Sequence, residues 1–234
     1  MKFGGTSVGK PERMYQVADL ITKDSDSKIV VLSALSGTTN ALVAIGNCLA
    51  QGDKEQAKDH IEKLEIHYKN FIMDLLAKEE FQAKAYTIIE EHFDFLNIIL
   101  KISFSDALSK DILAQGELMS TKLFCVYLEE KEIPHFLLPA LEFMMIDANE
   151  EPQVGIIRQK LMQILDKHTD KKLFITQGYI CKNARGEVDN LKRGGSDYTA
   201  SLIAAAIEAT VCEIWTDIDG MHNNDPRVVD KTQP

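Results

Sequence analysis

Two pairs of adjacent glycines stand beside basic side chains, and this combination can bind an anion. Gly4 and Gly5 follow Lys2 in KFGGTSVGK, and a second pair follows Arg193 in KRGGSD, just before a predicted helix. Such a pair lets backbone N–H groups converge on an anion, and the positive end of a following helix adds to the attraction. Neither loop has the complete GxxxxGKS/T motif or the GxGxxG spacing. The pattern predicts two anion sites, one per loop, each with its own cation; the alternative is two ordinary turns with solvated side chains.

Three further polar residues could bind a second reactant, although each also has a purely structural explanation. The fork-shaped guanidinium of Arg193 suits a carboxylate held bidentately, but it is also compatible with an ordinary surface charge. Asp197 opens the helix DYTASLIAAAIEA and could be only its N-cap. Glu117 in QGELMS could hold a substrate ammonium, or it could be favoured in a first helical turn by the helix dipole alone.

The aspartates near the end of the chain do not match a calcium loop. In WTDIDGMHNNDPR, His222 stands where such a loop requires glycine, and no glutamate closes the loop. We therefore expect a strand that ends in an Asp-Gly turn and leaves Thr216, Asp217 and Arg227 able to meet a nucleotide. The histidines are scattered, so no metal site is predicted. No GxSxG or Cys–His signature indicates a covalent nucleophile.

Short apolar runs alternate with helical patterns along the chain. Buried parallel strands are expected at residues 28–34, 135–140, 172–180 and 212–217, and helices at residues 12–22, 116–131, 156–167 and 197–209. This alternation predicts a doubly wound α/β layer structure, whose site is built by the loops that follow the carboxyl ends of the strands. Residues 53–111 are charged and helical in period, and we expect them to form a helical excursion on the same domain.

Composition narrows the function classes. The formal net charge of −10 argues against a nucleic-acid or anionic-membrane partner, which requires clustered basic charge. No apolar stretch reaches the roughly 20 residues of a membrane span, and the first residues lack the plan of a signal peptide. Cys48, Cys125, Cys181 and Cys212 are too far apart for CxxC metal pairs, and we interpret them as reduced, buried thiols. These features predict a cytoplasmic protein.

Six segments, in order along the chain, resemble one known family. They are KFGGTSV, VLSALSGTTN, QGELMS, ITQGYI, LKRGGSDYTA and WTDIDGMHNNDPRVV. Together they are similar to the catalytic domain of aspartate kinase, in the amino-acid kinase superfamily, over nearly the whole chain. The resemblance implies a carbamate-kinase-like three-layer α/β sandwich with a mainly parallel central sheet between helix layers. It also implies Mg²⁺- and ATP-dependent phosphorylation of the β-carboxylate of L-aspartate, which gives 4-phospho-L-aspartate, the first step toward lysine, threonine and methionine.

The resemblance also implies roles for individual residues. Lys2 would be the catalytic lysine that neutralises charge on the transferring phosphoryl group. Thr39 would contact the carboxylate being phosphorylated, and Arg193 would clamp the α-carboxylate. Glu117 and Asp197 would hold the substrate ammonium, and Asp197 would also belong to the catalytic set. The nucleotide side would comprise Lys2, Gly4, Gly5, Thr6, Ser7, Ser33, Thr216, Asp217, Asp225 and Arg227.

The chain departs from the family pattern in three respects. Lys192 stands where family members commonly have glycine, and His222 stands where they have tyrosine. The chain stops at Pro234, whereas the family continues with a further catalytic segment and with ACT domains, so we expect a catalytic domain over residues 1–234 that is truncated at its carboxyl end. Two alternatives remain open at this stage, a folded nucleotide- or aspartate-binding fragment without turnover and another carboxylate kinase. The parent protein is expected to be a homo-oligomer.

Overall fold

A parallel β-sheet forms the centre of the protein. The computed structural model describes residues 1–192, 194–216 and 229. In this part of the chain the sheet has five strands in the order β3-β4-β2-β1-β7, and every neighbouring pair is parallel. The strands are β1 (Lys2–Phe3), β2 (Lys28–Leu32), β3 (Phe136–Leu138), β4 (Leu173–Gln177) and β7 (Ile214–Trp215). The prediction of a mainly parallel central sheet is confirmed.

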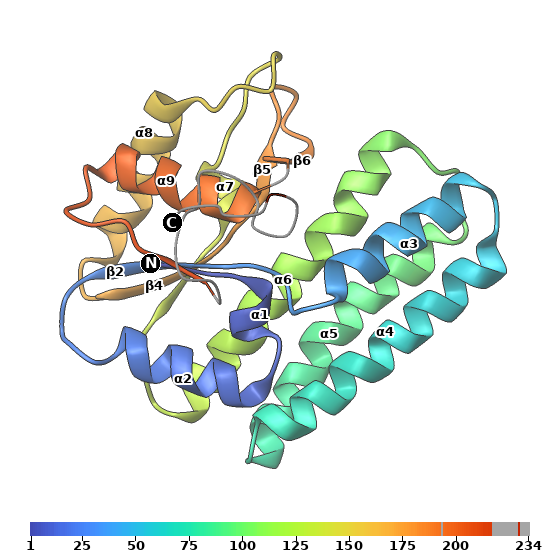
Figure 1. Ribbon diagram of the computed structural model, residues 1–234, viewed down its shortest axis with the longest axis horizontal. Helices are drawn as coiled ribbons and strands as arrows, with labels where there is room; N and C mark the ends of the chain where they lie inside the picture. Colours follow the sequence, from blue (N-terminus) through green and yellow to red (C-terminus); the bar gives the residue numbers. More distant parts are fainter. Residues whose placement is uncertain (193, 217–228, 230–234) are drawn as a thin grey trace.

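Helices cover both faces of this sheet, and the side chains of β2 show how. Val30 and Leu32 belong to the core cluster that contains residues of α2, whereas Val31 belongs to the cluster that contains residues of α8 and α9. Successive side chains of a strand point to opposite faces, so β2 is buried on both sides. Figure 1 shows α2 below the sheet and α8 and α9 above it. The elements of these layers are α1 (Gly5–Val8), α2 (Pro11–Ile21), α7 (Ala140–Phe143), α8 (Val154–Leu165), the 3₁₀ turn η1 (Asp166–His168) and α9 (Gly195–Ile207). The three-layer α/β sandwich is therefore confirmed.

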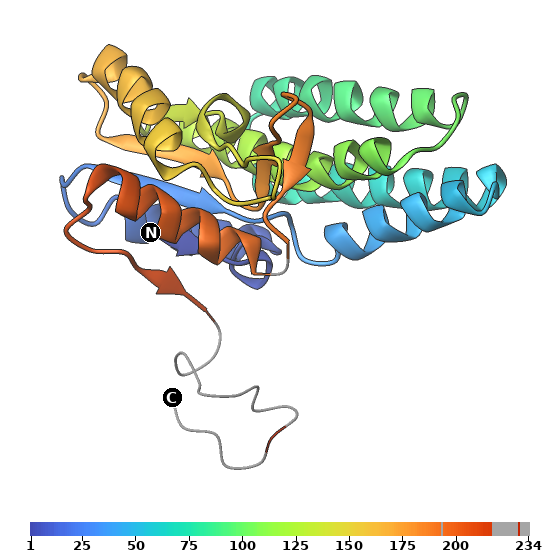
Figure 2. The same ribbon diagram turned by 90° about the horizontal axis from the view of Figure 1, so that it is seen from above.

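Long helices extend from one end of the sandwich. They are α3 (Thr38–Ala50), α4 (Lys54–Leu75), α5 (Glu79–Ile99) and α6 (Asp106–Glu130). Figures 1 and 2 show α3, α4 and α5 extending beyond the sheet, whereas α6 runs alongside them and also packs against the sheet. Ile61, Leu64 and Phe71 of α4 and Phe93 and Leu96 of α5 are buried in the same core cluster as α2 and β2. The predicted helical excursion is thus packed on the core of the sandwich.

Helix α6 begins earlier than the sequence pattern indicates. The pattern predicts a start at Gly116, but the helix begins at Asp106, after the cap Ser105, whose hydroxyl accepts a hydrogen bond from the Leu108 N–H at 3.2 Å. Gly116 lies in the middle of the helix, where a Cβ would stand 2.9 Å from the Cβ of Ala34. Close packing, and not a helix end, accounts for this glycine.

The predicted strand at residues 172–180 is two strands. β4 ends at Gln177, and β5 (Ile180–Lys182) pairs in antiparallel register with β6 (Val188–Asn190) in a hairpin that the sequence analysis does not predict. The break falls at Tyr179, whose φ of 67° lies in the left-handed region and cannot continue a strand. This turn directs the chain out of the sheet at the carboxyl end of β4.

The cysteines are not all buried. Cys48, Cys125 and Cys181 are buried free thiols, as predicted, whereas Cys212 is exposed. The prediction for Cys212 is wrong because the segment before β7 lies at the edge of the sheet, where nothing in the described part of the chain covers it. Among the described residues, no helix combines the length and apolar character that crossing a membrane requires.

Candidate active site

A cavity of about 740 Å³ opens at the carboxyl ends of the strands. Many of the residues predicted for the site line this cavity, namely Lys2, Gly4, Gly5, Thr6, Ser33, Thr39, Glu117, Asp197 and Thr216. Ser7 does not line it and instead faces a neighbouring pocket of about 610 Å³, which shares Thr216. Arg193, Asp217, Asp225 and Arg227, which were also predicted, lie outside the described residues. The fold therefore brings together segments from both ends of the chain.

Lys2 and Asp197 form an ion pair in the cavity. The Lys2 Nζ atom lies 2.6 Å from Asp197 Oδ1, and the two side chains are 12% and 52% exposed. Lys2 is fixed because β1 lies between β2 and β7, with the Lys2 N–H donating to Glu213 O at 2.8 Å. A Cβ on Gly4 would stand 3.3 Å from Lys2 Nζ, so the ammonium lies over the first glycine pair. The cation predicted for one loop is thus paired with the carboxylate of the other, and both loops serve one cavity.

Two helices begin at this cavity with a glycine in the left-handed conformation. Gly37 precedes α3 with a φ of 84°, and Gly194 precedes α9 with a φ of 77°. Neither helix has a side-chain cap. The N–H groups of Thr38 and Gly195 donate to Leu35 O and Lys192 O, and the N–H groups that follow them in each first turn are oriented toward the start of the helix, where a ligand could accept them. Asp197 lies in the first turn of α9 and is not its N-cap, which corrects that structural interpretation. Uncapped helix starts favour anionic groups through their N–H donors and their dipoles.

Glu117 is a buried carboxyl group in the wall of the cavity. The residue lies in the interior of α6 and not in a first turn, so the helix-dipole explanation for it is wrong. Its side chain is 4% exposed and accepts the Ala34 N–H at 3.3 Å, and no described cation pairs with it. Burial raises the pKa of Glu117 to about 7, despite hydrogen bonds that lower it. A buried carboxylate without a cation is suited to bind an ammonium group from a ligand.

The structure adds wall residues that the sequence analysis does not assign to the site, among them Tyr179, Lys192 and Ser196. The Ser33 hydroxyl donates to the Ser196 hydroxyl at 2.9 Å and so joins the loop after β2 to the start of α9. The pKa of Tyr179 is raised to about 12 by burial, and then by the nearby carboxylates of Glu117 and Asp189. The glycine–aromatic pair in TQGYI, after a buried strand, was the available signal for Tyr179.

Gly178 is required for the approach of α9 to the end of β4. A Cβ at this position would lie 2.6 Å from the Cβ and 2.9 Å from the Cα of Ser196, closer than real Cβ atoms come. We expect Gly178→Ala to destabilise the protein by roughly 1–3 kcal/mol, measured by urea unfolding, because backbone must move. Gly155→Ala in α8 is the matched control, since nothing lies within 4 Å of its added Cβ. Equal stability of the two variants would contradict this packing argument.

Comparison with known proteins assigns the class. The whole chain, residues 1–234, matches the model of the amino acid kinase family, and the chain belongs to that family. The lysine-sensitive aspartokinase 3 of Escherichia coli K12 is 34% identical over an alignment of 237 residues, gaps included, which covers 97% of this chain and 51% of that protein. Crystal structures of aspartokinase III from E. coli, one with lysine and aspartate and one with aspartate and ADP, match with a TM-score of 0.81 at 32% identity. Each match covers 99% of this chain and 52% of that one, so the chain spans about half the length of these relatives.

Proposed function

We propose that this protein is an aspartate kinase domain that transfers the γ-phosphoryl group of ATP to the β-carboxylate of L-aspartate. The product would be 4-phospho-L-aspartate, at the start of lysine, threonine and methionine biosynthesis. The observation that carries the proposal is the meeting of Lys2 and Asp197 in a cavity that also contains buried Glu117. Support comes from the aspartokinases among its relatives, one of which is solved with aspartate and ADP. Cytoplasmic location and a homo-oligomeric parent protein stay predictions.

The chemistry requires positioning and charge stabilisation more than proton transfer. The β-carboxylate is already ionised at neutral pH, so its oxygen attacks the γ-phosphorus without a general base. The new O–P bond forms as the bond to the β,γ-bridging oxygen breaks, and that oxygen leaves on ADP with its electron pair. The ammonium of Lys2 would contact the transferring phosphoryl group and stabilise its charge. Its ion pair with Asp197 holds it toward the cavity before the reactants arrive.

The acceptor would lie between α6 and α9. Glu117 and Asp197 would bind its ammonium from two sides, and this exchange of partners would free Lys2 for the phosphoryl group. Thr39, exposed at the first turn of α3, would contact the β-carboxylate. Arg193 remains the predicted clamp for the α-carboxylate and lies outside the described residues. The buried position of Glu117 supports this arrangement, because an ammonium would supply the cation that the protein does not.

The nucleotide would bind on the side of Gly4, Gly5 and Thr6. Ser33 and Thr216 line the same cavity, and Thr216 also lines the neighbouring pocket that contains Ser7. Asp217, Asp225 and Arg227 stay predicted contacts on this side. Mg²⁺ would neutralise charge on the ATP phosphates. Among the described residues there is no cluster of three or more potential metal ligands.

The test is ADP release from Mg-ATP by the purified protein with L-aspartate, L-glutamate, N-acetylglutamate or no acceptor. We expect release that depends on L-aspartate, with an acid-labile acyl phosphate as product. Release with another carboxylate alone would identify a different carboxylate kinase of the family. Calorimetric binding of ATP or aspartate without any release would show a binding module, and the phosphotransfer proposal would be wrong.

A further inference from the structure

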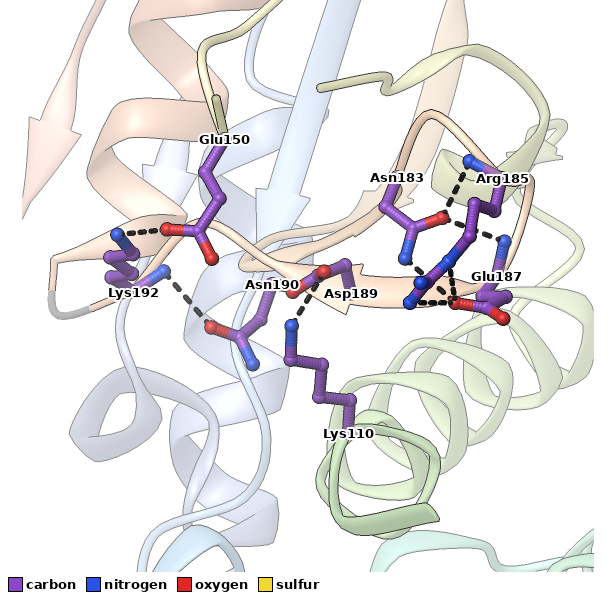
Figure 3. Close-up of polar contacts among 8 residues, drawn as sticks. All are labelled: Lys110, Glu150, Asn183, Arg185, Glu187, Asp189, Asn190 and Lys192. Carbon is purple, nitrogen blue, oxygen red and sulfur yellow. Dashed lines mark hydrogen bonds and ion pairs between the residues drawn. The ribbon is translucent and has the colours of Figure 1, made fainter. Parts of the chain in front are cut away.

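A partly buried ion pair anchors the β5–β6 hairpin to helix α6. Lys110 Nζ lies 2.6 Å from Asp189 Oδ2, and the Asp189 side chain is only 7% exposed. The other oxygen of this carboxylate accepts the N–H of the next residue, Asn190, at 2.7 Å. Figure 3 shows Lys110 rising from its helix to meet Asp189 in the last strand of the hairpin. β6 is followed by the loop before α9, and residues of that loop line the cavity, so this contact is close to the cavity along the chain.

Lys192, which follows β6 on the way to α9, has a backbone conformation that non-glycine residues do not favour. Lys192 has a φ of 62°, and its N–H donates to the Asn190 side chain at 3.1 Å. Its ammonium pairs with Glu150, as Figure 3 shows. The loop is closed by Leu191 N–H to Tyr179 O at 2.8 Å and by the Gly195 N–H to Lys192 O at 3.0 Å. A strained backbone conformation of this kind persists only where its surroundings determine it.

Helix α6 connects the anchor to the acceptor side of the cavity. Lys110 and Glu117 are seven positions apart, which is about two helical turns or ~10 Å along the same face. That face therefore carries both the residue that holds the hairpin and the carboxyl group proposed to bind the substrate ammonium. Asp197 lies in the first turn of α9, the helix that follows β6 along the chain. The ion pair thus joins the helix that carries Glu117 to the strand that precedes α9.

We propose that Lys110 and Asp189 are positioning residues for the acceptor site, an inference that rests on the proposed function. Neither residue lines the cavity, so they act through the loop and through α6. This ion pair is a weak source of stability, because desolvation of the buried Asp189 carboxylate offsets much of the attraction. Its directional geometry, which an apolar contact lacks, fixes the register of the hairpin on the helix. The distance between the residues proposed to bind the acceptor, Glu117 and Asp197, is then kept constant.

The kinetic test compares variants of the anchor with a control in the same hairpin. We expect Asp189→Asn and Lys110→Met to raise the KM for aspartate about tenfold, a typical coupling for an interacting pair, with the KM for ATP within about twofold. Lys110→Arg, which keeps the cation, should restore the KM to within about threefold. Glu187→Gln removes the ion pair with Arg185, which lies in the hairpin turn away from the loop, and should change neither KM (Figure 3).

Amide hydrogen exchange tests the inference without a measurement of enzyme activity. In Asp189→Asn we expect the amides of Leu191, Lys192 and Gly195 to exchange about tenfold faster, while those of β4 keep their protection. Lower melting temperature with unchanged loop exchange and unchanged KM for aspartate would show that the pair only stabilises the fold, and the inference would be overturned. A wild-type protein without aspartate-dependent ADP release would refute the proposed function, and faster loop exchange in the variant would still support the positioning role.

Discussion

Replacing Lys2 with alanine is expected to lower kcat for aspartate-dependent ADP release by roughly 10²-fold or more, the scale of losing one electrostatic contact to the transition state. The reason is geometric: β1 holds the Lys2 ammonium over Gly4, inside the cavity and beside Asp197. The charge on the phosphoryl group changes during transfer, so the loss should fall mainly on kcat and less on the KM for ATP. Steady-state kinetics with both reactants varied measures the two effects.

Two controls separate chemistry from folding in this experiment. Lys63→Ala removes a lysine of an exposed ion pair on α4, which lies outside the cavity, and should leave kcat unchanged. The Lys2→Ala variant should also keep its helical circular dichroism, because the carboxylate it leaves behind, on Asp197, is half exposed and remains hydrated. An unchanged kcat in a folded Lys2→Ala protein would remove Lys2 from the mechanism.

Glu117→Gln is expected to stabilise the protein at pH 8 and not at pH 5. Burial raises the pKa of Glu117 to about 7 from an ordinary value of 4.5, so the folded state holds a proton that the unfolded state has lost between these pH values. Stability from this group is therefore present below pH 4.5 and is lost as the pH rises to about 7. The full loss of folding stability is roughly 3 kcal/mol, and glutamine avoids it because its side chain does not ionise. Urea unfolding at the two pH values measures the difference.

The same substitution should weaken aspartate binding. Removal of the charged partner of the substrate ammonium should lower the affinity at pH 8 by tenfold or more, as is typical for a charged hydrogen bond, measured by calorimetry. Glu62→Gln on the exposed face of α4 is the matched control and should alter neither stability with pH nor affinity. A Glu117→Gln protein that gains the same stability at both pH values, or that binds aspartate normally, would contradict the buried-carboxylate argument.

The central sheet and the convergence of its loops could be predicted from the sequence. Residues 28–32 form an apolar run whose two faces are both buried, which is the pattern of an inner parallel strand. Once the strands are parallel, their carboxyl ends share one edge, and the polar residues after them must meet there. Lys2 and Asp197 could therefore be assigned to one site, although nothing in the sequence indicates that they pair with each other.

The β5–β6 hairpin and the place of Glu117 could not be predicted. β6 is the short, polar segment Val188–Asn190, which has no apolar alternation, and it is held by tertiary contacts such as the Lys110–Asp189 pair. The start of α6 was missed because Asp106 follows a polar segment and its cap, Ser105, is also an ordinary loop residue. Because the helix start was predicted ten residues too late, Glu117 was assigned to a first helical turn, although it lies in the interior of α6.

Three of the four cysteines are buried, so only Cys212 is accessible to a thiol reagent. Burial raises the pKa of Cys125 well above its usual value and that of Cys181 to about 12, and Cys48 is also buried. Only a thiolate reacts readily with an alkylating reagent, and a reagent must also reach it. Cys212 is the exposed thiol, two residues before the strand that pairs with β1. A maleimide dye on the unmodified sequence would consequently sit at one site, beside the strand that carries Lys2.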